Sequence, residues 1–129
     1  RMNTIDKTLA RILSKYGEFK LVMLFGSQAM GGADAASDID LALLADRPIS
    51  SSRKLELIEL IGAEFGRPVD IVDLYDAAEP VLGQVLKGKR LLGDNPTYAR
   101  LLTKHLINEA DFVPLQQRTL AERRAAWIH

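Results

Sequence analysis

The chain has 129 residues, of which 47% are hydrophobic and 26% charged, a composition typical of one folded domain and not of a disordered segment. Its 17 basic and 17 acidic residues balance, whereas nucleic-acid binders usually carry a basic excess, so we expect no direct nucleic-acid partner. The chain lacks cysteine, any apolar run long enough to cross a bilayer and a recognisable signal peptide, so we expect a cytoplasmic protein without disulfides or a membrane partner.

One helix and two strands are predicted over the first third of the chain. The helix covers residues 4–16, with Thr4 as its cap and Gly17 as its stop. Its apolar face consists of Ile5, Leu9, Ile12 and Leu13. Short apolar runs at residues 19–25 and 38–44 predict two buried strands.

The middle of the chain predicts a second helix over residues 50–65, a third strand over 69–74, a short helix over about 79–87 and an edge strand over 89–93. The apolar stripe expected on the longer helix consists of Leu55, Ile58, Leu60, Ile61 and Phe65. This alternation of strands and helices indicates an α/β (α+β) fold, with helices packed on a small mixed sheet.

A long final helix is predicted from Asn95 onward, and Pro114 kinks or breaks it. Its apolar side consists of Tyr98, Leu101, Leu102, Leu106, Ala110 and Val113. We expect a single domain with its core over residues 2–94. Residues 95–129 form a C-terminal helical extension, either packed on the core or used in part to dock a partner.

Two aspartates open the second predicted strand. Asp38 and Asp40 are two residues apart, so in a strand they project to the same side, with Ile39 and Leu41 turned towards the core. Neighbouring carboxylates repel each other unless a cation lies close by. Oxygen ligands suit Mg²⁺, which takes one or two protein carboxylates and completes its shell with phosphate oxygens and water. The pair therefore predicts a metal–nucleotide site.

A glycine-rich turn precedes this pair. Gly26 ends the first strand, where a tight turn needs permissive dihedral angles. Ser27 begins a predicted short helix, whose free N–H groups and hydroxyl could hold phosphate oxygens; a simple role as the helix cap is compatible with this. The segment is not a Walker loop, because no Gly-Lys-Ser/Thr follows.

A third carboxylate lies in the third predicted strand. If that strand pairs with the Asp38 strand, Asp70 faces the same cluster and acts as a general base or second metal ligand. Two metal ions could then clamp the attacking and leaving oxygens of a phosphoryl displacement. Asp73 is three residues further on, so it faces the opposite side, and we interpret it as a structural residue.

These motifs resemble a known family. Gly26-Ser27, ten further residues and then Asp38-Ile39-Asp40 are similar to the signature of polymerase-beta-like nucleotidyltransferases, in which a later strand carries the third carboxylate. The short length and the segment RPVDIVDLYDA most resemble the minimal nucleotidyltransferase (MNT) proteins. Many of these are antitoxins encoded beside a HEPN-domain toxin.

The resemblance implies a polymerase-beta-like nucleotidyltransferase fold and an enzyme that transfers AMP from ATP, with Mg²⁺, to a tyrosine hydroxyl of a HEPN ribonuclease toxin, which is thereby silenced. It also implies that Gly26 and Ser27 hold the triphosphate. Asp38, Asp40 and Asp70 would then be the catalytic, metal-binding carboxylates.

One position departs from the family pattern. Many members carry an arginine just before the second glycine of the loop, where this chain has Met30. Lys87, Lys89 or Arg90 could supply the missing cationic contact, and the sequence does not distinguish among them.

Two rival functions remain open from the sequence. One is a nucleotidyltransferase that acts on a small-molecule hydroxyl, as on an aminoglycoside, with an extra domain or a dimer to build the acceptor pocket. The other is a catalytically weak antitoxin that neutralises its partner by binding alone.

Overall fold

The computed structural model describes residues 3–26 and 38–110. In chain order its labelled elements are α1 (Thr4–Ser14), β1 (Phe19–Phe25), β2 (Ile39–Ala45), α2 (Ser51–Phe65), β3 (Val69–Asp73), α3 (Val81–Leu86) and β4 (Lys89–Gly93). Residues 95–110 form a further helix. None of the helices in the described ranges is both long and apolar enough to cross a membrane.

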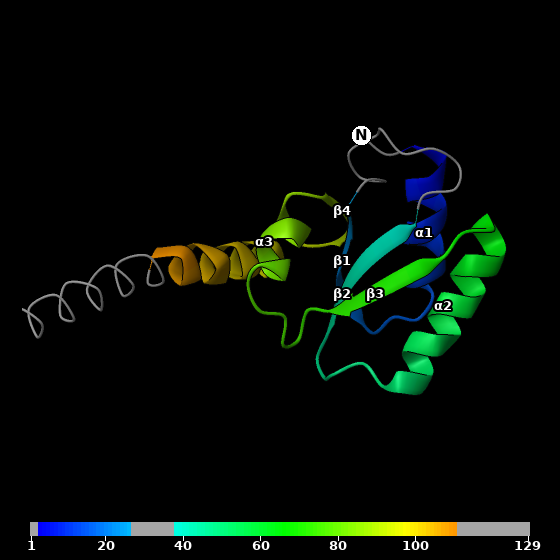
Figure 1. The fold of residues 1–129 in the computed structure, drawn as a ribbon, viewed down its shortest axis with the longest axis horizontal. Helices are drawn as coiled ribbons and strands as arrows, with labels where there is room; N and C mark the ends of the chain where they lie inside the picture. Colours follow the sequence, from blue (N-terminus) through cyan, green and yellow to red (C-terminus); the bar gives the residue numbers. More distant parts are fainter. Residues whose placement is uncertain (1–2, 27–37, 111–129) are drawn as a thin grey trace, which may run out of the picture.

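The described strands form one mixed sheet in the order β3-β2-β1-β4 (Figure 1). β1 runs antiparallel to both of its neighbours, β2 and β4, whereas β2 and β3 are parallel. The predicted mixed sheet is therefore confirmed, and so is the short edge strand over residues 89–93. The pairing of β3 with β2 also meets the condition on which the role of Asp70 depends.

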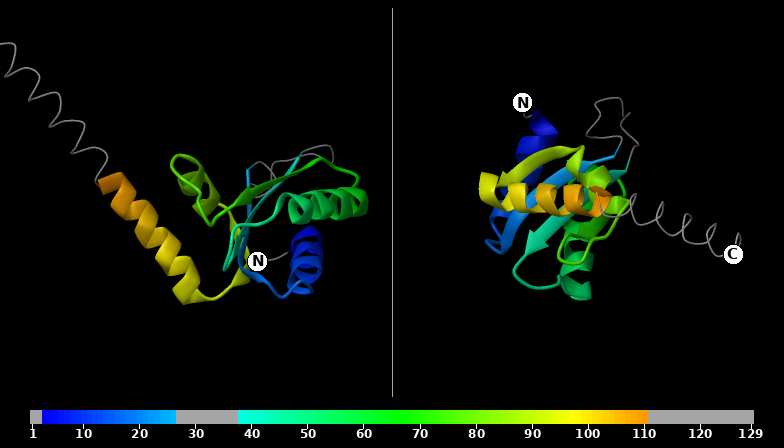
Figure 2. Two further views of the ribbon diagram at one scale, coloured as in Figure 1. Left: turned by 90° about the horizontal axis from the view of Figure 1, so that it is seen from below. Right: turned by 90° about the vertical axis from the view of Figure 1, so that its left-hand side faces the viewer.

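Helices cover both faces of the sheet (Figure 2). α1 and α2 pack on one face, where their Leu9, Leu13, Leu57 and Ile61 meet alternate strand residues. α3 packs on the other face through Leu82 and Val85, and Leu101 of the 95–110 helix joins it there. We call these two layers the α1/α2 core and the α3 core.

The cap of the N-terminal helix lies one residue earlier than predicted. It is Asn3, whose side chain accepts a hydrogen bond from the backbone N–H of Asp6 at 2.9 Å. The Asp6 carboxylate in turn accepts one from the Asn3 backbone, which completes a capping box. Thr4, predicted as the cap, is instead the first helical residue, because the reciprocal Asn3–Asp6 pair satisfies two free N–H groups.

The apolar stripe predicted for α2 is partly wrong. Leu55 and Leu60 are 56% and 47% exposed, whereas Leu57 and Ile61 are fully buried. The two buried residues lie one helical turn apart and both face the sheet. Ser50 caps this helix through its hydroxyl, and Gly66 ends it in a left-handed conformation.

The 95–110 helix packs on the sheet only near its start. Leu101 is buried and Tyr98 is partly buried against the α3 core, while Leu102, Leu106 and Ile107 are exposed. The prediction of an apolar side therefore holds for its first turns and not for Leu102 and Leu106. Val113 and Pro114 lie outside the described residues.

Candidate active site

Three strand ends meet at one edge of the sheet. β1 ends at Phe25, which pairs with Asp40 near the start of β2. Asp40 in turn pairs with Asp70 near the start of β3. The fold thus brings two of the three predicted carboxylates side by side on neighbouring strands, immediately beside Gly26.

Both carboxylates face the α3 side of the sheet. Ile39 and Leu41 lie in the α1/α2 core, as predicted, so the residue between them projects the other way. Val72, two residues after Asp70, likewise belongs to the α3 core. Asp40 and Asp70 therefore share one face.

The electrostatics of Asp40 reflect this crowding. Partial burial, and then the negative charges of Asp70 and Asp38, raise the pKa of Asp40 above its ordinary value. All three predicted carboxylates thus interact electrostatically at one place. A cation bound there would relieve the repulsion, so the donor set fits a divalent metal with a preference for oxygen ligands.

The carboxylate oxygens of Asp38, Asp40 and Asp70 do not all lie within 4.8 Å of one another, as the ligand atoms of one bound ion would. Among the described residues, the one group of three acidic or histidine side chains with ligand atoms all within 4.8 Å comprises Glu79, His105 and Glu109. Asp38 precedes β2 and is exposed, so it can rotate towards an ion.

The Glu79 group is better explained as a structural link. His105 contacts Glu79 through Nδ1 at 2.9 Å and Glu109 through Nε2 at 3.8 Å. The two closest contacts use different ring nitrogens, as in a histidine that bridges two carboxylates by a hydrogen bond or ion pair on each side. We assign no metal to this group.

Gly26 fits closely against Asp40. Its φ is +75°, a left-handed conformation that side chains rarely adopt. A Cβ at this position would collide with Oδ2 of Asp40. Glycine is therefore required here both by the backbone conformation and by the close approach of the carboxylate.

A cavity of about 440 Å³ opens at this edge. Its lining residues are Phe25, Gly26, Asp40, Asp70, Gln84, Lys87 and Gly88. The cavity joins the carboxylate pair to the C-terminal end of α3. Three lining residues, Phe25, Gln84 and Gly88, are not predicted as site residues from the sequence. For Gln84 and Gly88, nothing in the local sequence signals which strand end α3 will cover.

Asp73 is structural, as predicted. Its carboxylate accepts hydrogen bonds from the backbone N–H groups of Ile49 at 2.8 Å and Tyr75 at 2.9 Å. It thereby ties the segment before α2 to the end of β3. Ser27 and Met30 lie outside the described residues, and so does the rest of the predicted phosphate-binding turn beyond Gly26.

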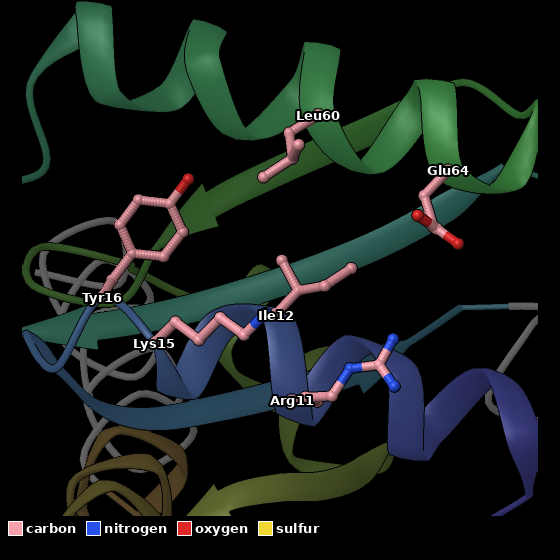
Figure 3. A pocket seen from close by; sticks show the side chains of 6 residues that line it. All are labelled: Arg11, Ile12, Lys15, Tyr16, Leu60 and Glu64. Carbon is pink, nitrogen blue, oxygen red and sulfur yellow. The ribbon is translucent and has the colours of Figure 1, made fainter.

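A second cavity, of about 360 Å³, lies between α1 and α2 (Figure 3). It is lined by Arg11, Ile12, Lys15, Tyr16, Leu60 and Glu64. Its side chains come from α1, the turn that follows α1, and α2, and they include one carboxylate, in contrast to the pair at the strand ends. The strand-end cavity is therefore the better candidate for phosphoryl chemistry.

Comparison with known families agrees with this geometry. Residues 7–97 match the family described as polymerase beta, nucleotidyltransferase. The chain belongs to this family, which confirms the class and the fold that the motifs resemble.

Among individual proteins, the chain is similar to the protein adenylyltransferase MntA of Shewanella oneidensis. The two are 32% identical over 89 residues, which is 68% of this chain and 64% of that protein. The match thus spans a little under two thirds of the relative's length.

Solved structures extend the similarity over almost the whole chain. A toxin–antitoxin crystallised with AMP-PNP has a TM-score of 0.70 and 26% identity, covering 96% of this chain and 95% of its own. A complex of a tri-AMPylated Shewanella oneidensis HEPN toxin with its MNT antitoxin gives a TM-score of 0.67 and 25% identity, covering 95% and 92%.

Proposed function

We propose that this chain is a protein adenylyltransferase that moves AMP from ATP to a tyrosine hydroxyl of a HEPN-domain toxin and so neutralises it. The observation that carries the proposal is the pairing of Asp40 with Asp70 beside Gly26, at the mouth of one cavity. Relatives of this family include a protein named adenylyltransferase and a complex with an AMPylated toxin, which supports the choice of substrate and partner. The cytoplasm, which supplies ATP, is the compartment we propose.

In this proposal Asp38 and Asp40 hold Mg²⁺, with Asp70 as a further ligand or as the base. The raised pKa of Asp40, caused by burial and by the neighbouring carboxylates, supports a cation at this place. What Mg²⁺ supplies there is neutralisation of phosphate charge and alignment of the triphosphate. Gly26 lets the backbone approach the phosphates, and Ser27 would contribute N–H and hydroxyl donors.

The reaction is a displacement at the α-phosphorus of ATP. The tyrosine oxygen forms a bond to that phosphorus, and the bond from phosphorus to the oxygen bridging the α- and β-phosphates breaks. AMP stays on the tyrosine, pyrophosphate leaves, and Asp70 accepts the hydroxyl proton. Asp70 is exposed, which suits a base that must reach an acceptor on another protein.

The division into a core over residues 2–94 and an extension over residues 95–129 belongs to the same proposal. Leu102 and Leu106, in the described part of the extension, are 36% and 57% exposed and lie one helical turn apart. Exposed apolar side chains on one side of a helix are a feature of protein-binding surfaces, which supports docking of the toxin there.

A co-expression experiment tests this proposal against neutralisation by binding alone. The HEPN-domain toxin that this proposal requires would be expressed with the unmodified chain or with its Asp38→Ala/Asp40→Ala variant. We expect the unmodified chain to restore growth and the variant to fail, although it still co-purifies with the toxin. Restored growth with the variant would favour steric neutralisation. In a separate assay with ATP and Mg²⁺, AMP transfer to an aminoglycoside would favour a small-molecule substrate.

A further inference from the structure

The triphosphate in the proposed site needs a positive partner from the protein. Cationic side chains and metal ions commonly contact the β- and γ-phosphates in phosphoryl-transfer enzymes. Three basic residues near α3 and β4 could serve: Lys87, Lys89 and Arg90. The structure separates them by what each side chain contacts.

Lys89 is engaged on the α1 side of the sheet. Its Nζ lies 3.4 Å from Oδ2 of Asp6, a carboxylate that is only 1% exposed. Moving Lys89 into the cavity would leave this buried carboxylate without its cation, which is costly. Lys89 is therefore a structural partner of Asp6.

Arg90 is engaged with the start of the 95–110 helix. Its guanidinium donates to the backbone oxygen of Asp94 at 3.1 Å and to Oδ1 of Asn95 at 2.8 Å. It also lies 4.9 Å over the ring of Tyr98. These contacts hold the charge of Arg90 away from the carboxylate pair.

Lys87 alone of the three lines the cavity with Asp40 and Asp70. Leu24 pairs with Lys89 across β1 and β4, and extending this antiparallel register by two residues places Lys87 opposite Gly26. No side-chain hydrogen bond or ion pair engages Lys87 within residues 3–26 and 38–110.

The adjacent Gly88 fixes this position. A Cβ at Gly88 would collide with the backbone oxygen of Leu24 and would lie 2.9 Å from Cα of Phe25. The turn therefore sits directly against the end of β1, where only glycine fits. The backbone that carries Lys87 is held beside the proposed phosphate site before any ligand binds.

We infer that Lys87 binds the triphosphate and stabilises the negative charge of the departing pyrophosphate. This inference rests on the proposed function and assigns one residue to it. Lys87 then supplies, from the turn after α3, the cationic contact that the loop lacks at Met30.

Calorimetric titration of the full chain with AMP-PNP and with AMP, both with Mg²⁺, tests the inference. Replacing Lys87 with Gln should weaken AMP-PNP binding about tenfold, the effect of losing one hydrogen bond to a charged group. AMP binding should change by less than about twofold, because AMP lacks the β- and γ-phosphates. Lys87→Arg keeps the charge and should restore most of the affinity for AMP-PNP.

Lys54→Gln is the matched control. Lys54 lies near the start of α2, and α2 follows the end of β2 that is far from the site. The substitution should therefore leave the affinities for AMP-PNP and AMP unchanged. Equal loss for AMP and AMP-PNP in Lys87→Gln, or no loss at all, would overturn the role of Lys87 while leaving the proposed function in place. Failure of the unmodified chain to bind AMP-PNP would overturn the proposed function, and this inference with it.

Discussion

Gly26 has two separate reasons to be glycine, and a matched pair of variants distinguishes them. Gly26 and Gly66 both have positive φ, at 75° and 64°, but only a Cβ at Gly26 meets a neighbour, the Asp40 carboxylate. Both alanine variants should lose about 1 kcal/mol of unfolding free energy from backbone strain. Gly26→Ala should in addition lower AMP transfer about 100-fold, because it displaces Asp40.

Denaturant unfolding and an AMP-transfer assay on both variants measure these two effects. Equal activity of Gly26→Ala and Gly66→Ala would mean that the position of Asp40 does not matter for the chemistry.

The alanine variants of Asp70 and Asp73 should lose different properties: the first AMP transfer and the second stability. Asp73→Ala leaves two backbone N–H groups without their acceptor and should cost about 1–3 kcal/mol of stability, with AMP-PNP binding retained. Asp70→Ala removes an exposed carboxylate that repels Asp40, so it should fold at least as stably and lose AMP transfer. Thermal unfolding and transfer assays measure both, and a stable, active Asp70→Ala would remove Asp70 from the mechanism.

The face of the sheet on which each aspartate lies could be predicted from the sequence, because spacing and strand alternation determine it. Asp40 faces away from Ile39 and Leu41, and Asp73 away from Asp70, as strand geometry requires. Lys87 could not be singled out in the same way. Its place depends on how the turn after α3 packs against β1, a contact between segments about sixty residues apart.

The α2 helix illustrates where a hydrophobic pattern is ambiguous. Leu55, Leu57, Ile58, Leu60 and Ile61 supply more apolar residues than one face can bury, so the sequence alone allows two neighbouring stripes. Packing on the sheet buries Leu57 and Ile61, with Ile58 and Phe65 partly buried beside them. The predicted stripe is thus wrong in including the exposed Leu55 and Leu60 and in omitting Leu57.

Two leucine variants test the corrected orientation of α2. Leu57→Ala should lower the unfolding free energy by about 2–5 kcal/mol, because it opens a cavity in the α1/α2 core. Leu55→Ala should change it by less than about 0.5 kcal/mol, since Leu55 is exposed. Urea unfolding of both variants measures the two free-energy changes. Similar losses for Leu57→Ala and Leu55→Ala would contradict an orientation of α2 that buries Leu57 and exposes Leu55.

The segment before α3 is tied to the 95–110 helix through Glu79. Its carboxylate contacts His105 Nδ1 at 2.9 Å and accepts a hydrogen bond from Asn108 at 3.2 Å, while Glu109 lies on the other side of the histidine ring. Partial burial raises the pKa of Glu79, but the contacts with His105 and Asn108 outweigh it, so the net pKa lies below its ordinary value of 4.5.

This lowered pKa predicts how the link depends on pH. The ionised Glu79 stabilises the folded chain fully above its unfolded pKa, and the stabilisation is lost as the pH falls through the lower folded pKa. The difference in unfolding free energy between the unmodified chain and Glu79→Gln should therefore shrink as the pH falls below 4.5. Denaturant titrations below this pH measure it, and a difference that grows there would contradict the assignment.

The overall architecture was largely predictable because each element carries its own signal. The predicted bounds of β1 and β4 are the observed ones, and those of the other labelled elements agree within two residues. The strand order could not be predicted from the sequence, because the pairing between β1 and β4 joins segments that are distant in the chain. That pairing brings the turn after α3 to the carboxylates and completes the cavity.

The central claim is that the aspartates at this edge of the sheet carry out AMP transfer to a toxin. Intact-mass measurement of the purified toxin, after incubation with the full chain, ATP and Mg²⁺, tests it most directly. The toxin should gain whole AMP units with the unmodified chain and none with Asp38→Ala/Asp40→Ala. An unchanged mass, despite a stable complex of the two proteins, would contradict the claim and leave neutralisation to binding alone.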